Sequence, residues 1–558
     1  MKWTDSGVGR RAMPGHTRGG RRIWPLLVAS LTALGTAVTV GVLGGGPAGA
    51  KPAPHASIDC ASHANLCAEV ADSEQVFGEG TYVGHDEPSN LFYSKQPGSG
   101  NQMRYQLWLP KDPPVNSKPG AASFNFQLHP TFWFGMALCA TESYPLQVSN
   151  CTPDTDRNIV DPAVSAAHPG TAFMEMQFYP PGWVPFQLPG GTSCSATQWC
   201  AALTIDSLAE NPVTGQQQNA TCVGIIGSPE YVNFAFITKN GTPQAPPNPV
   251  EATAATFTPD PNKDLFMNSG DHVVVTLHDT SGGLSIDLND TTSGGSGSMV
   301  SSSANGFGQV HFDPTGTSCN NVPYDFHPMY STSSEQTRVP WAAHTYNVAF
   351  SDEVGHFDFC GKATSSLGCS GSEGAPSNRE HTDTDDFFCW DASVSTLVPL
   401  TGCANSNVPG FDGTSYLADW PDGAANHPTP VMFTSPLTGS GYTDQYQRSA
   451  FETDLPRVEQ GLHGCDPFTD TGCTLIPITD DNKPADFYPF FSKINAPAGG
   501  CAWAIGNDIP GVTVNDFGRN MQYGTYDSGV AYTGLGGTPF LKSDDFRNIF
   551  SSNLCPSP

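Results

Sequence analysis

Basic residues are scarce in this sequence, which has 24 Lys and Arg against 53 Asp and Glu. Six of these basic residues and one of these acidic residues lie in the first fifty positions, so the rest of the chain has 18 against 52 and a net charge of −34. A surface this acidic repels phosphate backbones, and a nucleic-acid partner is therefore not expected. Neutral glycans, cationic polymers and calcium are compatible with it.

A second long apolar run is missing after the N-terminal segment, so no membrane span is expected in the mature chain. The first fifty residues are typical of an export signal. Five arginines lie between positions 10 and 22, the stretch from Leu26 to Leu43 is apolar and small, and Ala48-Gly49-Ala50 provides a cleavage site. The sequence therefore predicts a signal peptide over residues 1–50 and a secreted protein that begins near Lys51. General secretion and twin-arginine export both remain open.

No C-x-x-C pair occurs, which disfavours a zinc site, and no G-x-S-x-G elbow occurs, which disfavours an α/β-hydrolase. All sixteen cysteines lie after the cleavage site, and their number is even. In an exported chain this pattern predicts a disulfide framework. The pairs Cys60/Cys67, Cys194/Cys200 and Cys465/Cys473 are close enough in sequence to close local loops.

Charged residues make up only 14% of the chain, which also contains 59 Gly and 49 Pro, so long helices are not expected. Short runs with one apolar face alternate with turn residues between about residues 75 and 360. The clearest hairpin is HVVVTLHDTSGGLSIDLND, in which Val273, Val275 and Leu277 can meet Leu284, Ile286 and Leu288. One apolar face per strand predicts two packed sheets.

The fold class predicted is all-β, an antiparallel β-sandwich of the concanavalin A-like or jelly-roll type. We place this domain at residues 56–360 and an acidic flexible linker at 361–386. Residues 387–558 show little periodicity and hold six cysteines, so we expect a disulfide-stapled, irregular C-terminal extension. No internal repeat of fixed length is found.

The stretch TAFMEMQFYPPGW, from Thr171 to Trp183, predicts a strand with two different faces. Residues two apart share a face. One face is apolar and is expected in the core: Ala172, Met174, Met176 and Phe178. The other face presents Glu175 and Gln177 between aromatic residues, which is what a polysaccharide cleft requires. Two other interpretations stay open: the pair faces solvent, or it is buried and hydrogen-bonded beneath the C-terminal extension.

Glycoside hydrolysis normally needs two carboxyl groups. For Glu175 we consider Glu230, which opens the segment EYVNFAFIT, and Asp206 in LTIDSL as the second catalytic acid. Gln177, Tyr179 and Trp183 are the expected substrate-binding residues.

Clustered acids in two loops suggest calcium. Asp383, Asp385 and Asp386 lie together in HTDTDD, and they are the metal ligands we predict, although solvated acidic turns explain the same pattern. No cofactor is required by the sequence, and structural calcium is the one metal we consider.

The segments AFMEMQFYPP, EYVNFAFIT, GDHVVVTLHDTSGGLSIDLND and FYPFF are similar to segments of a group of large exported proteins of actinobacteria and fungi. The resemblance covers most of residues 60 to 555 and implies no reaction. The strand of Glu175 and the hairpin also resemble concanavalin A-like β-sandwiches, a fold that hosts glucanases, lectins and glutamic peptidases. The E-x-D-x-x-E pattern of its glycosidases is not matched, because Gln177 stands in place of the second acid. Glutamic peptidases use a Glu and a Gln from different strands.

The sequence therefore predicts a secreted, monomeric protein that acts on extracellular polysaccharide, with a glycoside hydrolase as the preferred function. Two alternatives stay open. One is a lectin-like protein that binds glycans without catalysis, and the other is an acid-acting peptidase of the glutamic type, with which the sequence pI of 4.6 is compatible.

Overall fold

The computed structural model describes residues 89–94, 96, 98–111, 123–124, 131–143, 170–179, 181, 194–195, 197–209, 217–226, 230–329, 348–353, 359–360, 429–456, 491–505, 543–550 and 552–557. Every strand pairing among these residues is antiparallel. The strands form two large sheets, which confirms the predicted all-β sandwich.

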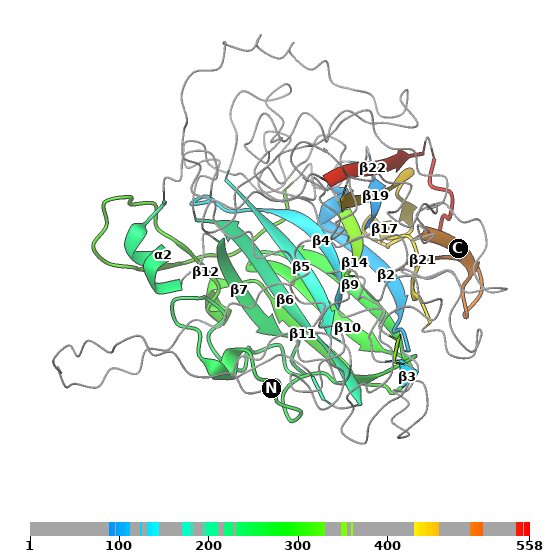
Figure 1. Ribbon diagram of the computed structural model, residues 1–558, viewed down its shortest axis with the longest axis horizontal. Helices are drawn as coiled ribbons and strands as arrows, with labels where there is room; N and C mark the ends of the chain where they lie inside the picture. Colours follow the sequence, from blue (N-terminus) through cyan, green and yellow to red (C-terminus); the bar gives the residue numbers. More distant parts are fainter. Residues whose placement is uncertain are drawn as a thin grey trace, which may run out of the picture.

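Sheet 1 has nine strands in the order β22-β19-β1-β14-β4-β5-β6-β7, with β8 paired to β6. In Figure 1, β5, β6 and β7 run side by side in cyan and green. The bounds of the strands in chain order are β1 Ser89–Tyr93, β4 Thr131–Cys139, β5 Thr171–Tyr179, β6 Gln198–Leu208, β7 Glu230–Phe236, β8 Met267–Asn268, β14 Val348–Glu353, β19 Arg448–Pro456 and β22 Ser543–Ile549.

Sheet 2 also has nine strands, in the order β11-β10-β9-β2-β16-β21-β20, with β17 paired to β2 and to β18. Their bounds are β2 Gln102–Trp108, β9 His272–Thr280, β10 Gly283–Asp290, β11 Ser296–Val300, β16 Val431–Phe433, β17 Leu437–Thr438, β18 Asp444–Gln445, β20 Phe491–Asn495 and β21 Cys501–Ile505. Two small two-stranded sheets accompany them, made of β12 Gly308–Val310 with β13 Asn321–Pro323, and of β3 Ser123–Phe124 with β15 Phe359–Cys360.

Alternation along β9 and β10 produces the hairpin that the sequence predicts. Val275 pairs with Leu288 and Leu277 pairs with Ile286. All four side chains belong to the main core cluster, as do the apolar residues of β5. Gly283 has φ 116 at the tight turn, and a Cβ there would lie 2.6 Å from the main-chain oxygen of Ser301, so only glycine fits.

The strands after residue 430 belong to both sheets. β16 lies between β2 and β21 in sheet 2, and β19 lies between β1 and β22 in sheet 1. The segment 361–386, which we interpret from sequence as a linker, lies outside the described residues. Segments on both sides of it in the sequence therefore share one sandwich core.

Five aromatic rings join the two sheets at their centre. The ring of Phe350 on β14 stacks on that of Phe433 on β16, with centroids 3.9 Å apart. It also meets the rings of Phe92, Tyr105 and Phe134 at distances between 4.6 and 6.0 Å. Such rings bury large apolar areas, and their packing fixes the spacing of the sheets.

Phe350→Ala is expected to lower the free energy of unfolding by about 3 to 5 kcal/mol, because it leaves a cavity among four rings. Ile225→Ala is the matched control, because Ile225 is 47% exposed and its loss is expected to change stability by less than about 0.5 kcal/mol. Urea denaturation of both variants measures the difference. Equal losses would contradict the assignment of Phe350 to the core.

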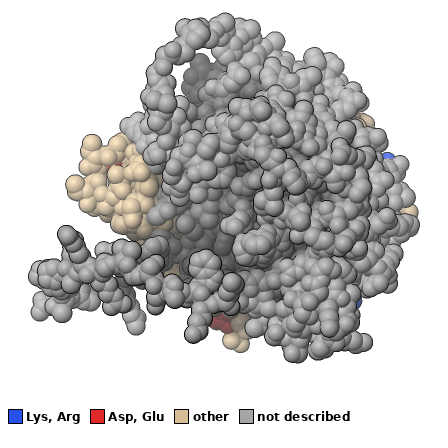
Figure 2. All heavy atoms as spheres, viewed as in Figure 1, with Lys and Arg blue, Asp and Glu red and all other residues tan. Residues whose placement is uncertain are grey.

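The α-helix α2, Ala220–Ile226, contains no charged residue. Figure 2 shows the region of α2 at the left, where almost all of the visible described residues are uncharged. Cys222 of this helix forms a disulfide with Cys319, which precedes β13. Two further disulfides join Cys194 to Cys200 and Cys501 to Cys555. The predicted Cys194/Cys200 pair is thus confirmed, while Cys60/Cys67 and Cys465/Cys473 lie outside the described residues.

Candidate functional site

The candidate site lies on the face of β5 that points away from sheet 2. The inner face of β5 consists of Ala172, Met174, Met176 and Phe178, all in the main core, as predicted. The opposite face carries Thr171, Phe173, Glu175, Gln177 and Tyr179, and every one of these side chains is buried. Both faces of the strand are therefore shielded from solvent, and the interpretation that Glu175 faces solvent is wrong.

The strand register relates the backbone positions of the three predicted catalytic acids. Glu175 pairs with Thr204 of β6, and Asp206 lies two residues further along the same face. Asp206 in turn pairs with Val232 of β7, two residues from Glu230. Diagonal neighbours of this kind lie about 7 to 8 Å apart. Glu175, Asp206 and Glu230 therefore follow a diagonal across three adjacent strands.

This diagonal favours Asp206 over Glu230 as the partner of Glu175. Glu175 pairs with Thr204 of β6, which pairs with Phe234 of β7. Phe234 lies four residues from Glu230 along β7. With strands about 4.8 Å apart and a rise of about 3.3 Å per residue, Glu175 and Glu230 are separated by roughly 16 Å. Carboxyl pairs in glycosidases are separated by at most about 9.5 Å.

Glu175 is held by a chain of polar contacts along its own strand. The Gln177 side-chain nitrogen Nε2 donates a hydrogen bond of 2.6 Å to Glu175 Oε2. The Tyr179 hydroxyl donates to Gln177 Oε1. Thr204 Oγ1 donates to the main-chain oxygen of Glu175 at 3.2 Å. The amide of Gln177 is thus fixed at both ends, and it orients the carboxylate.

Aromatic rings flank the acids on the same face. Trp133 of β4 pairs with Gln177, and its ring meets that of Phe173 edge to face at 5.6 Å. Between them lies Gly135, opposite Glu175, where an added Cβ would come within 2.4 Å of the Phe173 ring. Glycine therefore makes the room in which both rings pack beside Glu175. Sequence reasoning missed Trp133, although the alternation of TFWFGMALC signals that it lies on the outer face.

Glu175 and Asp206 are 2% and 3% exposed. Two buried acids one diagonal step apart, one of them oriented by an amide, can supply a proton and a carboxylate to a single bond. Glu230 begins β7, and only its main-chain position is described. Trp183 and the predicted metal ligands Asp383, Asp385 and Asp386 lie outside the described residues.

A second pair of buried carboxyls lies where β9 begins and β10 ends. Asp271 Oδ2 accepts hydrogen bonds from the main chain of Asn268 at 2.6 Å and from its side chain at 3.1 Å. Asp290 Oδ1 accepts from the main-chain nitrogens of Thr292 and Ser293 at 2.9 and 3.0 Å. Each carboxyl caps a turn, which explains its burial without chemistry.

These two carboxyls titrate as a pair. Burial, together with a hydrogen bond to Asp290, raises the pKa of Asp271. Burial also acts to raise the pKa of Asp290, but hydrogen bonds from Ser293 and Thr292 outweigh it and hold that pKa below its ordinary value. The stability that Asp271 contributes is lost as pH rises through its raised pKa. The stability that Asp290 contributes is lost as pH falls through its lowered pKa. The pair stabilises the fold most when it holds one proton.

Asp271→Asn is expected to stabilise the protein at pH 7 by about 1 kcal/mol, because the amide provides a permanent N–H toward Asp290 and keeps an oxygen for Asn268. At pH 4 the gain should be smaller, because the raised pKa of Asp271 favours the protonated pair as pH falls. Urea denaturation at both pH values measures this. Asp290→Asn serves as the contrast and should destabilise at both pH values. Its amide keeps one oxygen for the main-chain nitrogens of Thr292 and Ser293 but replaces Oδ2, to which the Ser293 hydroxyl donates. A loss of stability in Asp271→Asn at pH 7 would contradict the shared proton.

Comparison with known proteins finds no matching family model, no matching curated protein and no matching solved structure. No helix within the described ranges is long and apolar enough to cross a membrane. In the same part of the chain, no group of three or more His, Cys, Asp and Glu side chains is arranged to hold a metal ion.

Proposed function

We propose that the protein is an exported glycoside hydrolase that uses Glu175 and Asp206 as its carboxyl pair. The observation that carries the proposal is the diagonal register of these two acids on one buried, aromatic-flanked face of β5 and β6. The acidic surface and the disulfides are compatible with work on neutral extracellular polysaccharides.

In this mechanism one carboxyl protonates the glycosidic oxygen of the leaving sugar, and the other attacks the anomeric carbon or activates a water molecule. Asp206 is assigned the role of proton donor in this proposal, and Phe173 lies directly opposite it in the register. Glu175 suits the second role, because the Gln177 amide donates to its ionised form. Trp133 provides a ring on which a sugar can stack.

Burial sets a condition on this proposal. A polysaccharide reaches two acids that are 2% and 3% exposed only when this face opens to it. Carbodiimide labelling tests that condition, because the reagent modifies carboxyls that solvent reaches. Protection of Glu175 by an oligosaccharide would support binding at this face.

A glutamic-type peptidase is the second candidate, and the hydrogen bond of 2.6 Å between Gln177 and Glu175 favours it. In such an enzyme the carboxylate activates water, and the amide stabilises the oxyanion that forms on the scissile carbonyl. The geometry differs from that class in having both residues on one strand.

Product analysis separates these functions. The mature protein and its Glu175→Gln variant are incubated with plant, fungal and bacterial polysaccharides and with a denatured protein, and the products are identified by mass spectrometry. Oligosaccharides from the wild type alone would support the glycosidase, whereas peptides would support the peptidase. Asp287→Asn is the control, because Asp287 lies on sheet 2 with a side chain that is 50% exposed. Glycan binding without any product would leave the lectin-like alternative.

A further inference from the structure

An uncompensated buried carboxylate oxygen lies where the edges of the two sheets meet. Thr238 follows β7, the edge strand of sheet 1, and forms isolated β-bridges with Asp264 on one side and with Ser298 of β11, the edge strand of sheet 2, on the other. Residues directly opposite one another across a bridge point to the same face. The three oxygen-bearing side chains of Asp264, Thr238 and Ser298 therefore form one row.

Two atoms of this row are buried without a partner. Asp264 is 0% exposed; its Oδ2 accepts a hydrogen bond of 2.7 Å from the main-chain nitrogen of Asp260, but its Oδ1 has no hydrogen-bond partner in the described part of the chain. The same is true of Oγ1 of Thr238, which is also 0% exposed. Buried polar atoms are nearly always hydrogen-bonded, so adjacent exceptions on bridge partners indicate a missing ligand.

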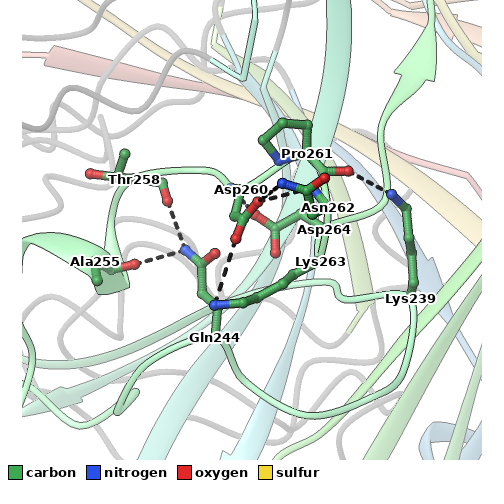
Figure 3. A network of polar contacts seen from close by, with 9 residues as sticks. All are labelled: Lys239, Gln244, Ala255, Thr258, Asp260, Pro261, Asn262, Lys263 and Asp264. Atoms are coloured by element: carbon green, nitrogen blue, oxygen red, sulfur yellow. Dashed lines mark hydrogen bonds and ion pairs between the residues drawn. The ribbon is translucent and has the colours of Figure 1, made fainter.

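The two neighbouring lysines form no direct ion pair with this carboxylate. Figure 3 shows the network around Asp264, in which Lys239 Nζ donates to the main-chain oxygen of Pro261 at 2.7 Å. Lys263 Nζ lies 3.6 Å from Asp260 Oδ2, and Asp264 itself forms no ion pair with any described residue. Both lysines act on Asp264 only at longer range, so a cation in direct contact with its Oδ1 would still be stabilised.

We propose that Asp264 Oδ1 and Thr238 Oγ1, with the hydroxyl of Ser298 at the end of the row, bind a calcium ion. Calcium takes six to eight hard oxygen ligands in flexible geometry, and carboxylate, hydroxyl, main-chain and water oxygens all suit it. The Ser298 hydroxyl lies close to Gly241, where an added Cβ would come within 2.9 Å of it. Magnesium suits the row less, because it demands a near-ideal octahedron and gives up its water reluctantly.

The ion would tie the edge of sheet 1 to the edge of sheet 2 and hold the segment 239–263 between them. The site offers calcium only one negative charge, that of Asp264. The positive charges of Lys239 and Lys263 weaken the attraction of the site for calcium further. We therefore expect a dissociation constant of about 0.1 to 1 mM, the range of extracellular calcium modules. An exported protein meets calcium at such concentrations, so the site is a structural clamp and not a sensor.

Calcium and a proton compete for the same oxygen. Burial, as the largest effect, raises the pKa of Asp264 to about 6. A proton on this carboxyl removes a calcium ligand, so the affinity for calcium should weaken as pH is lowered.

Titration calorimetry with calcium chloride on the chelator-treated full exported chain tests the proposal. The wild type should bind calcium at pH 7 with the affinity given above, and Asp264→Asn should lose at least tenfold. Thr238→Val, which keeps the side-chain shape if the first variant fails to fold, should weaken binding severalfold. Asp287→Asn and the combined change of Asp383, Asp385 and Asp386 to Asn should leave this binding event unchanged.

Three results would overturn the proposal: no calcium binding by the wild type, unchanged binding by Asp264→Asn, or loss of the event in the 383/385/386 variant. A crystal structure grown in calcium chloride provides a second readout. An ion within about 2.3 to 2.6 Å of Asp264 Oδ1 supports the site, whereas a water molecule that bridges Asp264 and Thr238 overturns it.

Discussion

Removal of the Cys222–Cys319 disulfide should destabilise the protein by roughly 4.7 kcal/mol, among the largest effects expected of any change to the described residues. The bond joins residues 97 positions apart, so it removes a large loop-closure entropy from the unfolded chain. Cys222 is also fully buried against Ala209, Ile226, Tyr231 and Val310. Urea denaturation of the Cys222→Ala/Cys319→Ala variant under oxidising conditions measures the loss.

The Cys194–Cys200 disulfide provides a control within the same chain. Its cysteines are 6 positions apart, and the same entropy relation gives roughly 2.2 kcal/mol for Cys194→Ala/Cys200→Ala. The two double variants should therefore differ by roughly 2.5 kcal/mol. Equal losses would show that strain or residual structure in the unfolded chain, and not loop length, sets the contribution of these bonds.

Under the proposed glycosidase mechanism, Glu175→Gln and Asp206→Asn should each reduce kcat/KM on a polysaccharide by about 10² to 10⁴, the range that a catalytic acid or base contributes. Both changes preserve side-chain size, so the melting temperature should stay within a few degrees of that of the wild type. Because this mechanism has both acids act on one bond, the double variant should lose little more activity than the worse single variant. Full activity in the Glu175→Gln variant would show that Glu175 has only a structural role in the protein interior.

Gln177→Leu separates the two enzyme classes. In the glycosidase Gln177 only orients Glu175, so kcat should fall about tenfold while KM stays near that of the wild type. In the peptidase the amide stabilises the oxyanion, and its removal should reduce kcat by about 10² to 10³. A loss of kcat in Gln177→Leu as large as that in Glu175→Gln would therefore favour the peptidase.

Period-2 alternation was enough to predict the parts of the fold that have one apolar face. The inner face of β5 and the pairing of Val275 with Leu288 follow from such alternation, and both are observed. The Cys194/Cys200 bond followed from short spacing alone. Local patterns succeed here because side-chain direction in a strand depends only on sequence position.

Long-range features were not predictable in the same way. Nothing in VMF, at 431–433, indicates that it pairs with β2, more than 320 residues earlier. The polar face of β5 has the composition of an exposed cleft, but Glu175 and Gln177 are buried and bonded to each other. Register with β6 selected Asp206 over Glu230, because diagonal neighbours depend on which residues pair across strands.

The position of β1 in sheet 1 affects the order in which the chain can fold. Ser89 pairs with Ser351 and with Glu452, partners that follow it by 262 and 363 residues. A strand whose neighbours lie so far away has a high contact order, and high contact order slows folding. A ribosome or translocase must release roughly four fifths of the 558 residues before β1 can find β19. One edge of β1 therefore stays unpaired for most of synthesis, and chaperone occupancy of residues 89–93 should persist until residue 452 has emerged.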